Sequence, residues 1–466
     1  MAIYRANTAE PIEFYRDQLT MKLTFDKGTI LIRGDIRVPN STWDERSKAF
    51  RAMALYYRDI IDFLKISGLE FKDDVLNLIP CPEIQSSVVL RDYQKQALDA
   101  WTANGHRGVI VLPTGSGKTV VGIKAISLLN TPALVVAPTL DLVDQWRTRL
   151  KKEFDTDVGV LGGGERDIRA LTVSTYDSAY IHAERLGNRF GLIIFDEVHH
   201  LPAAGYRNIA EMFASPYRMG LTATFEREDG LHADLNRLVG GKVFEKRVKE
   251  LSGTHLSPFR LEKIVVELTE EEQQEYERNQ KVFSNYLARI NLTIKGPADF
   301  QKLVMRSGRD PGARRALLAR NRAREIAYNS VSKMGTLSTI LKNHRDGKIF
   351  IFTEHNKLVH SISKEFLIPA ITYRTTTKER TETLDRFRSG VYRAVVTSKV
   401  LDEGIDVPDA DVGIILSGTG SERAFIQRLG RILRKKEGKE AVLYEIVSAE
   451  TSEVGTARRR KRPLNR

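Results

Sequence analysis

The sequence predicts an α/β protein with two lobes built on parallel sheets, a small α+β domain before them and a helical insertion between them. Short apolar segments alternate with helix-forming segments in residues 86–250 and again in residues 330–450. Strands this apolar are usually covered by helices on both faces, as in a parallel sheet. Residues 268–328 lack such strands and are rich in charge and helix formers. A length of 466 residues, about three times that of a typical domain, also favours several domains.

Residues 1–85 are expected to form the small α+β domain. Residues 25–30 predict a hairpin, because Asp-Lys-Gly stands between alternating apolar residues. Thr42 precedes an acidic turn and is typical of a helix start, so a helix is expected from there toward Leu64. The two prolines around Cys81 mark a linker to the first lobe.

Nine apolar segments are the expected strands of the two lobes. In residues 86–250 they are Gly108–Leu112, Ala133–Ala137, Ala170–Ser174, Leu192–Phe195 and Met219–Leu221. In residues 330–450 they are Lys348–Thr353, Arg393–Thr397, Val412–Leu416 and Ala441–Ile446. Residues 451–466 form a tail whose basic run, Arg458–Arg462, is expected to be disordered.

The composition is that of a globular protein with a polyanionic partner. Hydrophobic residues make up 41% and charged residues 29% of the chain, which excludes wholesale disorder and collagen-like repeats. Lys and Arg number 73 against 60 acidic residues, and the resulting net charge of +13 favours nucleic acid as a partner.

Cysteine usage and the length of apolar runs indicate an intracellular protein. A single cysteine, Cys81, excludes an internal disulfide and a thiolate zinc cage. No stretch approaches the roughly 20 apolar residues of a membrane span, and no signal-peptide segment is recognisable. We therefore expect a cytoplasmic location, nucleoid-associated in a prokaryote, and no membrane partner.

A glycine-rich segment between an expected strand and an expected helix carries the clearest chemistry. Its residues are Thr114, Gly115, Ser116, Gly117, Lys118 and Thr119. Glycines let backbone N–H groups surround phosphate oxygens, and the helix start adds its dipole. Lys118 is expected to reach the β and γ phosphates of ATP, and the Thr119 hydroxyl to coordinate Mg²⁺. The usual pattern has a glycine where this chain has Leu112, but the position between strand and helix favours a phosphate site over an ordinary turn.

An acidic pair, Asp196 and Glu197, directly follows the expected strand Leu192–Phe195. The carboxyl end of a buried parallel strand lies at the sheet edge where ligands bind. Asp196 is the expected Mg²⁺ ligand and Glu197 the expected base that activates the attacking water. A helix cap explains the pair equally well in isolation, but the phosphate loop upstream favours catalysis. His199 and His200 are adjacent, so their side chains point in different directions, and no further Cys or His ligand accompanies them. We therefore do not expect zinc.

Together these segments resemble a superfamily 2 helicase over residues from about 88 to 450, which implies two RecA-like lobes. The resemblance implies that Arg91 and Gln94 read the adenine of ATP, although a plain helix start explains Gln94 as well. For ATP hydrolysis, the resemblance implies catalytic roles for Lys118 and Glu197 of the first lobe and for two arginines of the second lobe.

Several hydroxyl residues at strand ends resemble the motifs with which this superfamily holds a nucleic-acid strand. The resemblance implies phosphate contacts from Thr139, Ser174 and Thr175, made without reading bases. Thr222 and Thr224 resemble the motif that couples hydrolysis to strand binding. Ordinary strand-to-loop turns remain the alternative for each of them.

The second lobe carries two further motifs of the superfamily. One implies that Thr397 contacts the nucleic-acid strand and that Gly404 and Asp406 contact the nucleotide. The other resembles the arginine-finger motif, in which Arg431 and Arg434 are three residues apart and share one face of a helix. Their guanidinium groups are expected to bind the γ-phosphate and to stabilise its transition state. Solvated arginines on a helix are the alternative, which the Gln-x-x-Gly-Arg-x-x-Arg spacing disfavours.

Within the superfamily, the resemblance narrows to the xeroderma pigmentosum group B (XPB) type in its short, archaeal-like form. The features are the triplet Arg227, Glu228 and Asp229, the helical segment 268–328 and the compact N-terminal unit. In that family the triplet is associated with unwinding, the helical segment forms a thumb, and a similar N-terminal domain is proposed to sense damaged DNA. A charged loop is the alternative for the triplet.

The resemblance implies an ATP-dependent 3′–5′ DNA helicase or translocase with ATP and Mg²⁺ as cofactors, acting in DNA repair or transcription. Its implied partner is single-stranded, fork or bubble DNA, with no small-molecule substrate besides ATP. Any strand cleavage is expected from a separate nuclease partner. Two alternatives stay open: a duplex translocase that does not separate strands, and a binding scaffold with a vestigial ATPase. Phosphate contacts do not distinguish DNA from RNA.

Overall fold

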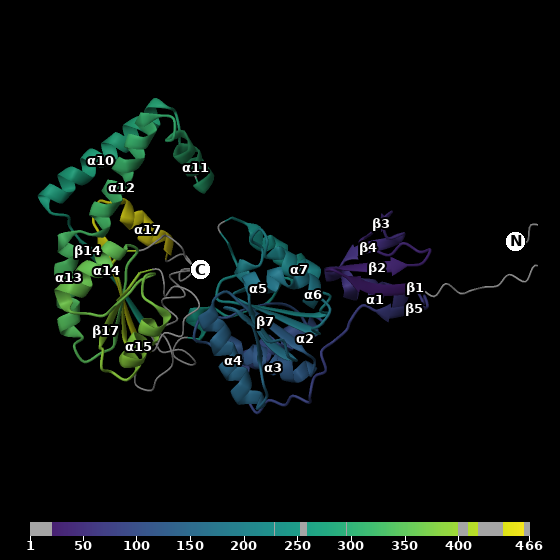
Figure 1. Ribbon diagram of the computed structural model, residues 1–466. Coiled ribbons are helices and arrows are strands. Elements are labelled where there is room, and N and C mark those ends of the chain that lie inside the picture. Colours follow the sequence, from purple (N-terminus) through teal and green to yellow (C-terminus); the bar gives the residue numbers. More distant parts are fainter. Residues whose placement is uncertain are drawn as a thin grey trace, which may run out of the picture.

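The computed structural model describes residues 21–227, 229–251, 259–294, 296–398, 409–417 and 441–460. These residues form a five-stranded sheet near the N-terminus, an eight-stranded sheet and a six-stranded sheet. The first lobe lies in the middle, with the N-terminal domain on one side and the second lobe on the other (Figure 1). A group of helices extends from the second lobe (Figure 1). The expected α/β fold with two parallel-sheet lobes is confirmed.

The N-terminal domain consists of a sheet and a helical segment packed on it. Its elements are β1 (Met21–Asp26), β2 (Thr29–Arg33), β3 (Ser41–Asp44), β4 (Ala49–Met53), η1 (Ala54–Tyr56), α1 (Tyr57–Ile66) and β5 (Phe71–Asp74). The strand order is β3-β4-β2-β1-β5. The expected hairpin is confirmed, since Phe25 pairs with Ile30 across β1 and β2.

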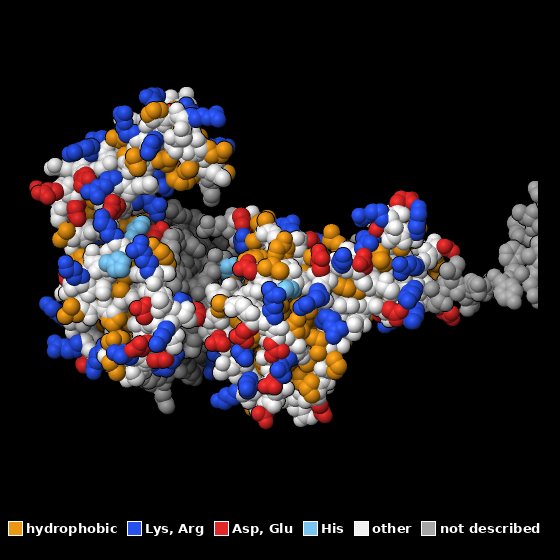
Figure 2. Space-filling view, viewed as in Figure 1, with side chains coloured by type: hydrophobic (Ala, Val, Ile, Leu, Met, Phe, Trp, Pro, Cys, Tyr) orange, Lys and Arg blue, Asp and Glu red, His pale blue; other side chains and the backbone are white. Residues whose placement is uncertain are grey.

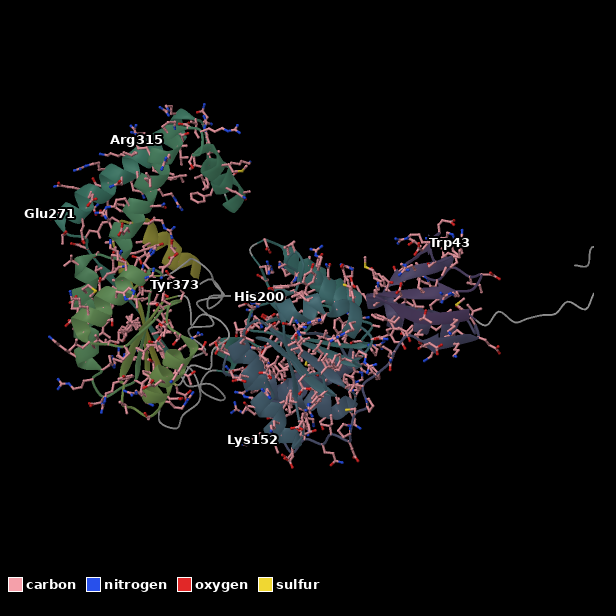
Figure 3. All side chains as sticks on the ribbon, in the orientation of Figure 1. Trp43, Lys152, His200, Glu271, Arg315 and Tyr373 are labelled. Atoms are coloured by element: carbon pink, nitrogen blue, oxygen red, sulfur yellow. The ribbon has the colours of Figure 1, made fainter. Side chains whose placement is uncertain are left out.

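The helix expected to start at Thr42 is wrong. Thr42 lies in β3, and the helix starts only at Tyr57. Trp43 stands opposite Phe50 of β4, and their rings meet edge to face with centroids 5.2 Å apart. Cross-strand aromatic contacts of this kind stabilise a hairpin, and here they outweigh the local cap signal. Trp43 lies on the outer part of this domain (Figure 3).

The first lobe is an eight-stranded sheet in the order β13-β6-β12-β11-β7-β10-β8-β9, parallel except for the β8–β9 pair. Its strands are β6 (Arg107–Val111), β7 (Ala133–Ala137), β8 (Gly159–Gly162), β9 (Glu165–Arg166), β10 (Leu171–Thr175), β11 (Leu192–Asp196), β12 (Tyr217–Thr222) and β13 (Lys242–Glu245). Its helices are α2 (Asp92–Ala103), α3 (Lys118–Leu129), α4 (Leu140–Phe154), α5 (Tyr176–Ile181), α6 (Ala183–Leu186), η2 (Val198–His200), α7 (Arg207–Met212), η3 (Leu231–Asp234), α8 (Leu235–Leu238) and α9 (Val248–Leu251). Residues of α2, α3 and α4 pack on one face of the sheet, and residues of α5 to α8 pack on the other. Helices on both faces explain the apolar strands.

The second lobe is a six-stranded parallel sheet in the order β14-β19-β18-β15-β17-β16. Its elements are β14 (Phe259–Val266), α13 (Val331–Asn343), β15 (Ile349–Phe352), α14 (Asn356–Phe366), β16 (Ala370–Ile371), α15 (Thr377–Arg388), β17 (Ala394–Thr397), β18 (Val412–Ile415), β19 (Ala441–Ser448) and α17 (Ser452–Arg460). Strand β14 was not expected from the sequence. It precedes the helical insertion in the chain, yet it pairs with β19 along its whole length.

The basic run at the C-terminus was expected to be disordered, which is wrong for Arg458–Arg460. These residues belong to α17. The helix is held by Glu453, which is fully buried and pairs with Lys333 of α13. A buried ion pair at the start of a helix fixes its position, which no composition argument detects. Residues 461–466 lie outside the described residues.

Three helices form the insertion: α10 (Glu270–Arg289), α11 (Pro297–Arg306) and α12 (Pro311–Tyr328). Capping supports two of them, since Thr269 and Asp310 accept hydrogen bonds from the first turns of α10 and α12. The insertion has a small core of its own around Tyr286 and Leu303. Arg315 lies on its outer part (Figure 3).

Candidate ATP site and its link to nucleic acid

Strand order brings the sequence motifs of the first lobe together. In the sheet, β12 lies between β6 and β11. The phosphate loop follows β6, Thr222 ends β12 and Asp196 ends β11. All three strands are parallel, so their carboxyl ends meet at one edge. His200, just beyond this edge, lies on the side of the first lobe that faces the second lobe (Figure 3).

The phosphate loop requires its glycines. Gly115 and Gly117 have φ angles of +81° and +84°, which side chains rarely tolerate. A Cβ atom on Gly117 would also lie 2.6 Å from Nε2 of Gln94. The loop is held from behind, because the carbonyl oxygen of Ser116 accepts hydrogen bonds from the Tyr93 hydroxyl at 2.6 Å and from Gln94 Nε2 at 2.8 Å.

Gln94 therefore has a structural part in this conformation. Its Oε1 accepts a hydrogen bond from the backbone N–H of Arg91 at 2.9 Å, which caps α2, and its Nε2 holds the loop. The side chain is 3% exposed. Adenine recognition by Gln94 would require the amide to exchange one of these bonds, and it stays a prediction.

The residues around the loop fit a nucleotide triphosphate. Lys118 begins α3, and its Nζ lies 3.4 Å from the carbonyl oxygen of Leu112 and 3.9 Å from Oε1 of Glu197. The Thr114 hydroxyl is buried and has no hydrogen-bond partner among the described residues. These groups form a cradle that phosphate oxygens would complete. Phosphate would give the Thr114 hydroxyl a hydrogen-bond partner and would bind Lys118, and the glycines let the loop backbone approach it.

Asp196 is oriented by Trp146, a residue that was not expected from the sequence to belong to the site. Its Oδ2 accepts a hydrogen bond from the indole N–H of Trp146 at 2.8 Å, and its Oδ1 accepts one from the backbone of Glu197 at 3.0 Å. Trp146 lies in α4 and is 1% exposed. A tryptophan on the apolar side of a helix cannot be distinguished from a core residue in sequence. Carboxylate oxygens such as those of Asp196, and hydroxyl groups such as that of Thr119 in the first turn of α3, are ligand types that suit Mg²⁺.

Glu197 has a strained backbone. Its φ and ψ angles of 47° and 53° are left-handed, an uncommon conformation for a residue other than glycine. Strain of this kind is often kept at functional sites, where it aims a side chain. Its carboxylate contacts Lys118 through one oxygen and approaches His199 Nδ1 at 3.4 Å through the other.

His199 links the acidic pair to the coupling motif. Its Nδ1 lies 3.1 Å from the Thr222 hydroxyl, and the ring is fully buried. Thr222 Oγ1 donates to the carbonyl oxygen of Thr224 at 2.8 Å and lies 3.5 Å from Glu197 Oε2. From the sequence, His199 was considered only as a zinc ligand, because its contact with Thr222 depends on strand order.

The chain of contacts continues into the charged triplet. Arg227 donates from Nη1 to the carbonyl oxygen of His199. It also binds Asp229 through two parallel hydrogen bonds of 2.9 and 2.6 Å. The Arg227 guanidinium lowers the pKa of Asp229 to about 2, so this carboxyl stays charged. Glu228 lies outside the described residues.

The hydroxyls expected to contact nucleic-acid phosphates differ in position. Thr139 and Thr175 cap α4 and α5, accepting hydrogen bonds from Leu142 and Ser178 at 3.3 and 3.2 Å. Both helix N-termini lie at the ligand edge of the sheet. Ser174 is fully buried and donates to the Thr175 carbonyl oxygen, so its side chain is not presented to a ligand here.

In the second lobe only part of the expected site is described. Thr397 ends β17, is fully buried and donates to the carbonyl oxygen of Ser398. Gly404, Asp406, Arg431 and Arg434 lie outside the described residues. The lobes themselves are joined by an ion pair between Arg380 Nη1 and Asp141 Oδ2 at 3.0 Å.

Two parallel-sheet lobes, with a phosphate loop and an acidic pair at the edge of the first, fit a superfamily 2 helicase, and comparison with known proteins shows this class. Family models match in three places: "Type III restriction enzyme, res subunit" at 87–227, "Helicase conserved C-terminal domain" at 332–436, and "Xeroderma pigmentosum group B helicase damage recognition domain" at 23–75. The chain belongs to the XPB family of these helicases, as the relatives below also show.

A relative from Sulfurisphaera tokodaii named DNA 3′-5′ translocase XPB2 is 46% identical, over 94% of this chain and 99% of its own length. A relative from Mycobacterium tuberculosis named DNA 3′-5′ helicase XPB is 31% identical, over 80% of this chain and 63% of its own length. The solved Hef helicase domain of Pyrococcus furiosus has the same fold, with a TM-score of 0.53 and 20% identity over 79% of this chain and 97% of that one. Among the described residues, no helix combines the length and apolarity needed to cross a bilayer.

Proposed function

We propose that this protein is an ATP-driven 3′–5′ DNA motor that opens or unwinds DNA, with a role in repair or transcription. The observation that supports it most is the continuous path of contacts from Lys118 through Glu197 and His199 to Thr222 and Arg227. This path joins the phosphate site to a surface loop. A shift of Lys118 or Glu197 on ATP hydrolysis can therefore be transmitted to this loop through side-chain contacts, without large changes in the sheet.

Chemistry at the site follows from the described groups and from the second-lobe arginines. Thr119 and Asp196 would hold Mg²⁺, which neutralises phosphate charge when bound. Lys118 binds the β and γ phosphates, and Glu197 orients the attacking water and takes its proton. Arg431 and Arg434 complete the site when the lobes close. Both lobes contact the phosphates of ATP when they are closed. Hydrolysis removes this shared contact, so the lobes reopen.

The DNA strand is expected to run across the ligand edges of both lobes. Thr139 and Thr175 stand at helix N-termini, where backbone N–H groups favour phosphate. Thr222 and Thr397 end β12 and β17 and are fully buried. Thr222 and Thr224 would couple hydrolysis to strand binding, and Thr397 belongs to the motif expected to contact the strand. Lys and Arg side chains are also spread over the helical insertion and the N-terminal domain (Figure 2). Contacts to phosphate predict weak sequence preference and strong salt dependence. Strand cleavage, if it accompanies opening, belongs to a separate nuclease partner.

A duplex translocase that does not separate strands is the second candidate. The relative that is 46% identical bears the name translocase, whereas the M. tuberculosis relative bears the name helicase. The ATP site would be the same in both cases, so only the product of the motor distinguishes them.

Strand displacement from a forked duplex and third-strand displacement from a triplex, measured side by side, test the proposal. Unwinding predicts ATP-dependent release in both assays, and duplex translocation predicts release only from the triplex. ATPase rates with single-stranded, duplex and bubble DNA and with RNA, at one salt concentration, identify the activating nucleic acid. An ATPase that no nucleic acid stimulates would contradict the motor and favour a scaffold.

A further inference from the structure

A cavity of about 340 Å³ lies where the N-terminal domain meets the first lobe. Its lining includes Tyr56, Arg58, Asp59, Arg107, Arg237 and Gly240. Arg107 is the first residue of β6, and the phosphate loop follows the last one. The cavity is therefore at the opposite edge of the sheet from the ATP site. The N-terminal domain, which forms part of its lining, lies on the side of the first lobe away from the second lobe (Figure 1).

The lining carries three guanidinium groups and one carboxylate. Arg58 comes from α1 of the N-terminal domain, while Arg107 and Arg237 come from the first lobe. Asp59 is the lining carboxylate, and its side chain is 50% exposed. Two of the arginines also pair with acids outside the lining, Arg58 with Asp62 at 3.6 Å and Arg237 with Glu211 at 2.5 Å. The lining itself carries more cationic than anionic groups, and a partly enclosed surface of this kind attracts anions.

The fold makes room for these arginines to converge. Arg58 donates to the carbonyl oxygen of Gly105, and a Cβ atom on Gly105 would lie 2.9 Å from its Nη2. On the other side, a Cβ atom on Gly240 would lie 2.9 Å from Cβ of Arg107. Both glycines have positive φ angles, +67° and +119°. Larger residues at either place would push the arginines apart.

Arg107 has unused hydrogen-bonding capacity. Its side chain is 15% exposed, and its nearest acid is Asp59 at 3.7 Å, too far for a good hydrogen bond. Its Nε is buried and has no hydrogen-bond partner among the described residues. Burial lowers the pKa of Arg107; the charge of Asp59 opposes this shift, and the charge of Arg58 adds a smaller contribution in the same direction as burial. An anion in the cavity would reduce the repulsion between Arg58 and Arg107 and would accept the hydrogen bond that Arg107 Nε lacks.

Arg237 has a hydrogen-bond partner in each of the two domains. It donates from Nη2 to Glu211 Oε1 at 2.5 Å, and a hydrogen bond with Tyr56 also raises its pKa against the effect of burial. Tyr56 belongs to the N-terminal domain and Glu211 to the first lobe. The cavity is therefore built by both domains and exists only while they are docked.

We propose that this cavity binds a phosphate group, which fastens the N-terminal domain to the first lobe. Arginine forks match the geometry of phosphate oxygens and are suited to hold them by paired hydrogen bonds. The volume is at the lower end for ligand sites, which suits a single phosphate group with water. The phosphate is either a free anion or belongs to a nucleic-acid strand that passes the cavity mouth. This site goes beyond the proposed motor function, because it is remote from the ATP site.

Thermal unfolding of the full chain in inorganic phosphate, against chloride at equal ionic strength, tests the proposal. Phosphate at about ten times its dissociation constant should raise the Tm by about 2–4 °C. Lys118→Ala removes the lysine of the ATP site and should keep this rise. In the Lys118→Ala background, where the ATP site has lost its phosphate-binding lysine, Arg107→Gln should abolish the rise, and the exposed Arg149→Gln should not. Arg237→Gln supplies the same test if Arg107→Gln does not fold. A rise that is equal in the Lys118→Ala background with and without Arg107→Gln, or absent from wild type, would overturn the proposal.

A second arm identifies the source of the phosphate. Affinity for a short duplex is measured for wild type and Arg107→Gln with and without phosphate. A severalfold loss in the variant, with phosphate competing in wild type, shows that the group belongs to DNA. Equal DNA affinities beside a lost thermal shift show that it is a free anion. ATPase activity of the variant without DNA should stay at the wild-type level in either case.

Discussion

Each lobe contains a lysine–glutamate pair, and the two pairs differ in how completely they are closed. In the first lobe, Lys118 Nζ lies 3.9 Å from Glu197 Oε1, and the side chains are 10% and 12% exposed. In the second lobe, Lys333 Nζ lies 2.6 Å from Glu453 Oε2, and the side chains are 2% and 0% exposed. Chemically identical groups thus form an open pair in one lobe and a sealed pair in the other.

Their remaining partners explain the difference. Lys333 also donates to the carbonyl oxygen of Leu416, and Glu453 accepts from the backbone of Ser448. These bonds join α13, α17 and the ends of two strands, so the sealed pair supports the fold. The open pair leaves donors and acceptors for a ligand. A charge pair that is incompletely bonded at a sheet edge is therefore a better sign of a ligand site than a tight one.

The largest expected effect would come from the second lobe, and it tests whether chemistry is confined to the first. Arg431→Ala should lower kcat of ATP hydrolysis by about 10³-fold, because the guanidinium group stabilises charge that develops in the transition state. Binding of a non-hydrolysable ATP analogue should fall much less. Unchanged kcat with weaker nucleotide binding would contradict the finger and leave the first lobe as the sole source of chemistry.

Opening the first-lobe pair should strongly reduce ATPase activity without unfolding the protein. Lys118→Ala should reduce DNA-stimulated ATPase by at least about 10²-fold, because it removes a preorganised phosphate ligand. The melting temperature should stay near that of wild type. Lys152→Ala, exposed on the same lobe (Figure 3), is the control. Near-normal turnover in Lys118→Ala would refute its assignment.

Breaking the second-lobe pair should instead lower the stability of the fold and leave ATPase activity unchanged. Lys333→Ala leaves a buried charge on Glu453 and should cost about 3–5 kcal/mol of unfolding free energy, measured by denaturant titration. Replacing both partners, as in Lys333→Met with Glu453→Leu, should recover most of that loss. ATPase per folded molecule should remain unchanged, and a selective loss of kcat would show that this pair also serves catalysis.

The Trp146–Asp196 bond sharpens the comparison within the first lobe. Trp146→Phe keeps the ring but removes the N–H donor, and it should raise the Mg²⁺ concentration for half-maximal ATPase by about 10-fold. Trp101→Phe is a matched control, because its buried indole donates to the carbonyl oxygen of Arg218 instead of to the site. Equal Mg²⁺ dependence in the two variants would mean that Trp146 has only a packing role.

The smallest effect is expected at the ion pair between the lobes. Arg380→Gln removes the bond to Asp141 and should change the balance between lobe arrangements by about fivefold at most, as expected for a partly exposed pair. Energy transfer between dyes on the two lobes would measure the shift. Lys378→Gln, exposed on the same helix, should leave the balance unchanged. A similar shift in both variants would assign the effect to net charge.

Local patterns account for much that was predicted correctly. The strand Ala133–Ala137 was expected with its observed bounds, and the hairpin at residues 25–30 was expected from its turn. Both signals are contained in a few neighbouring residues. Strand β14 escaped notice, because its membership of the second sheet depends on β19, which is far away in the chain. The helix expected at Thr42 was wrong for the same reason, since a partner strand decided the conformation.

The sequence by itself determined the α/β class, the phosphate loop and the acidic pair. Glycine spacing and apolar runs suffice for these features, because they specify conformations over a few residues. Only the tertiary structure decided that Trp146 holds Asp196, that His199 stands between Glu197 and Thr222, and that arginines from two domains share a cavity. Such contacts depend on strand order and domain docking, which bring together residues that no local pattern connects.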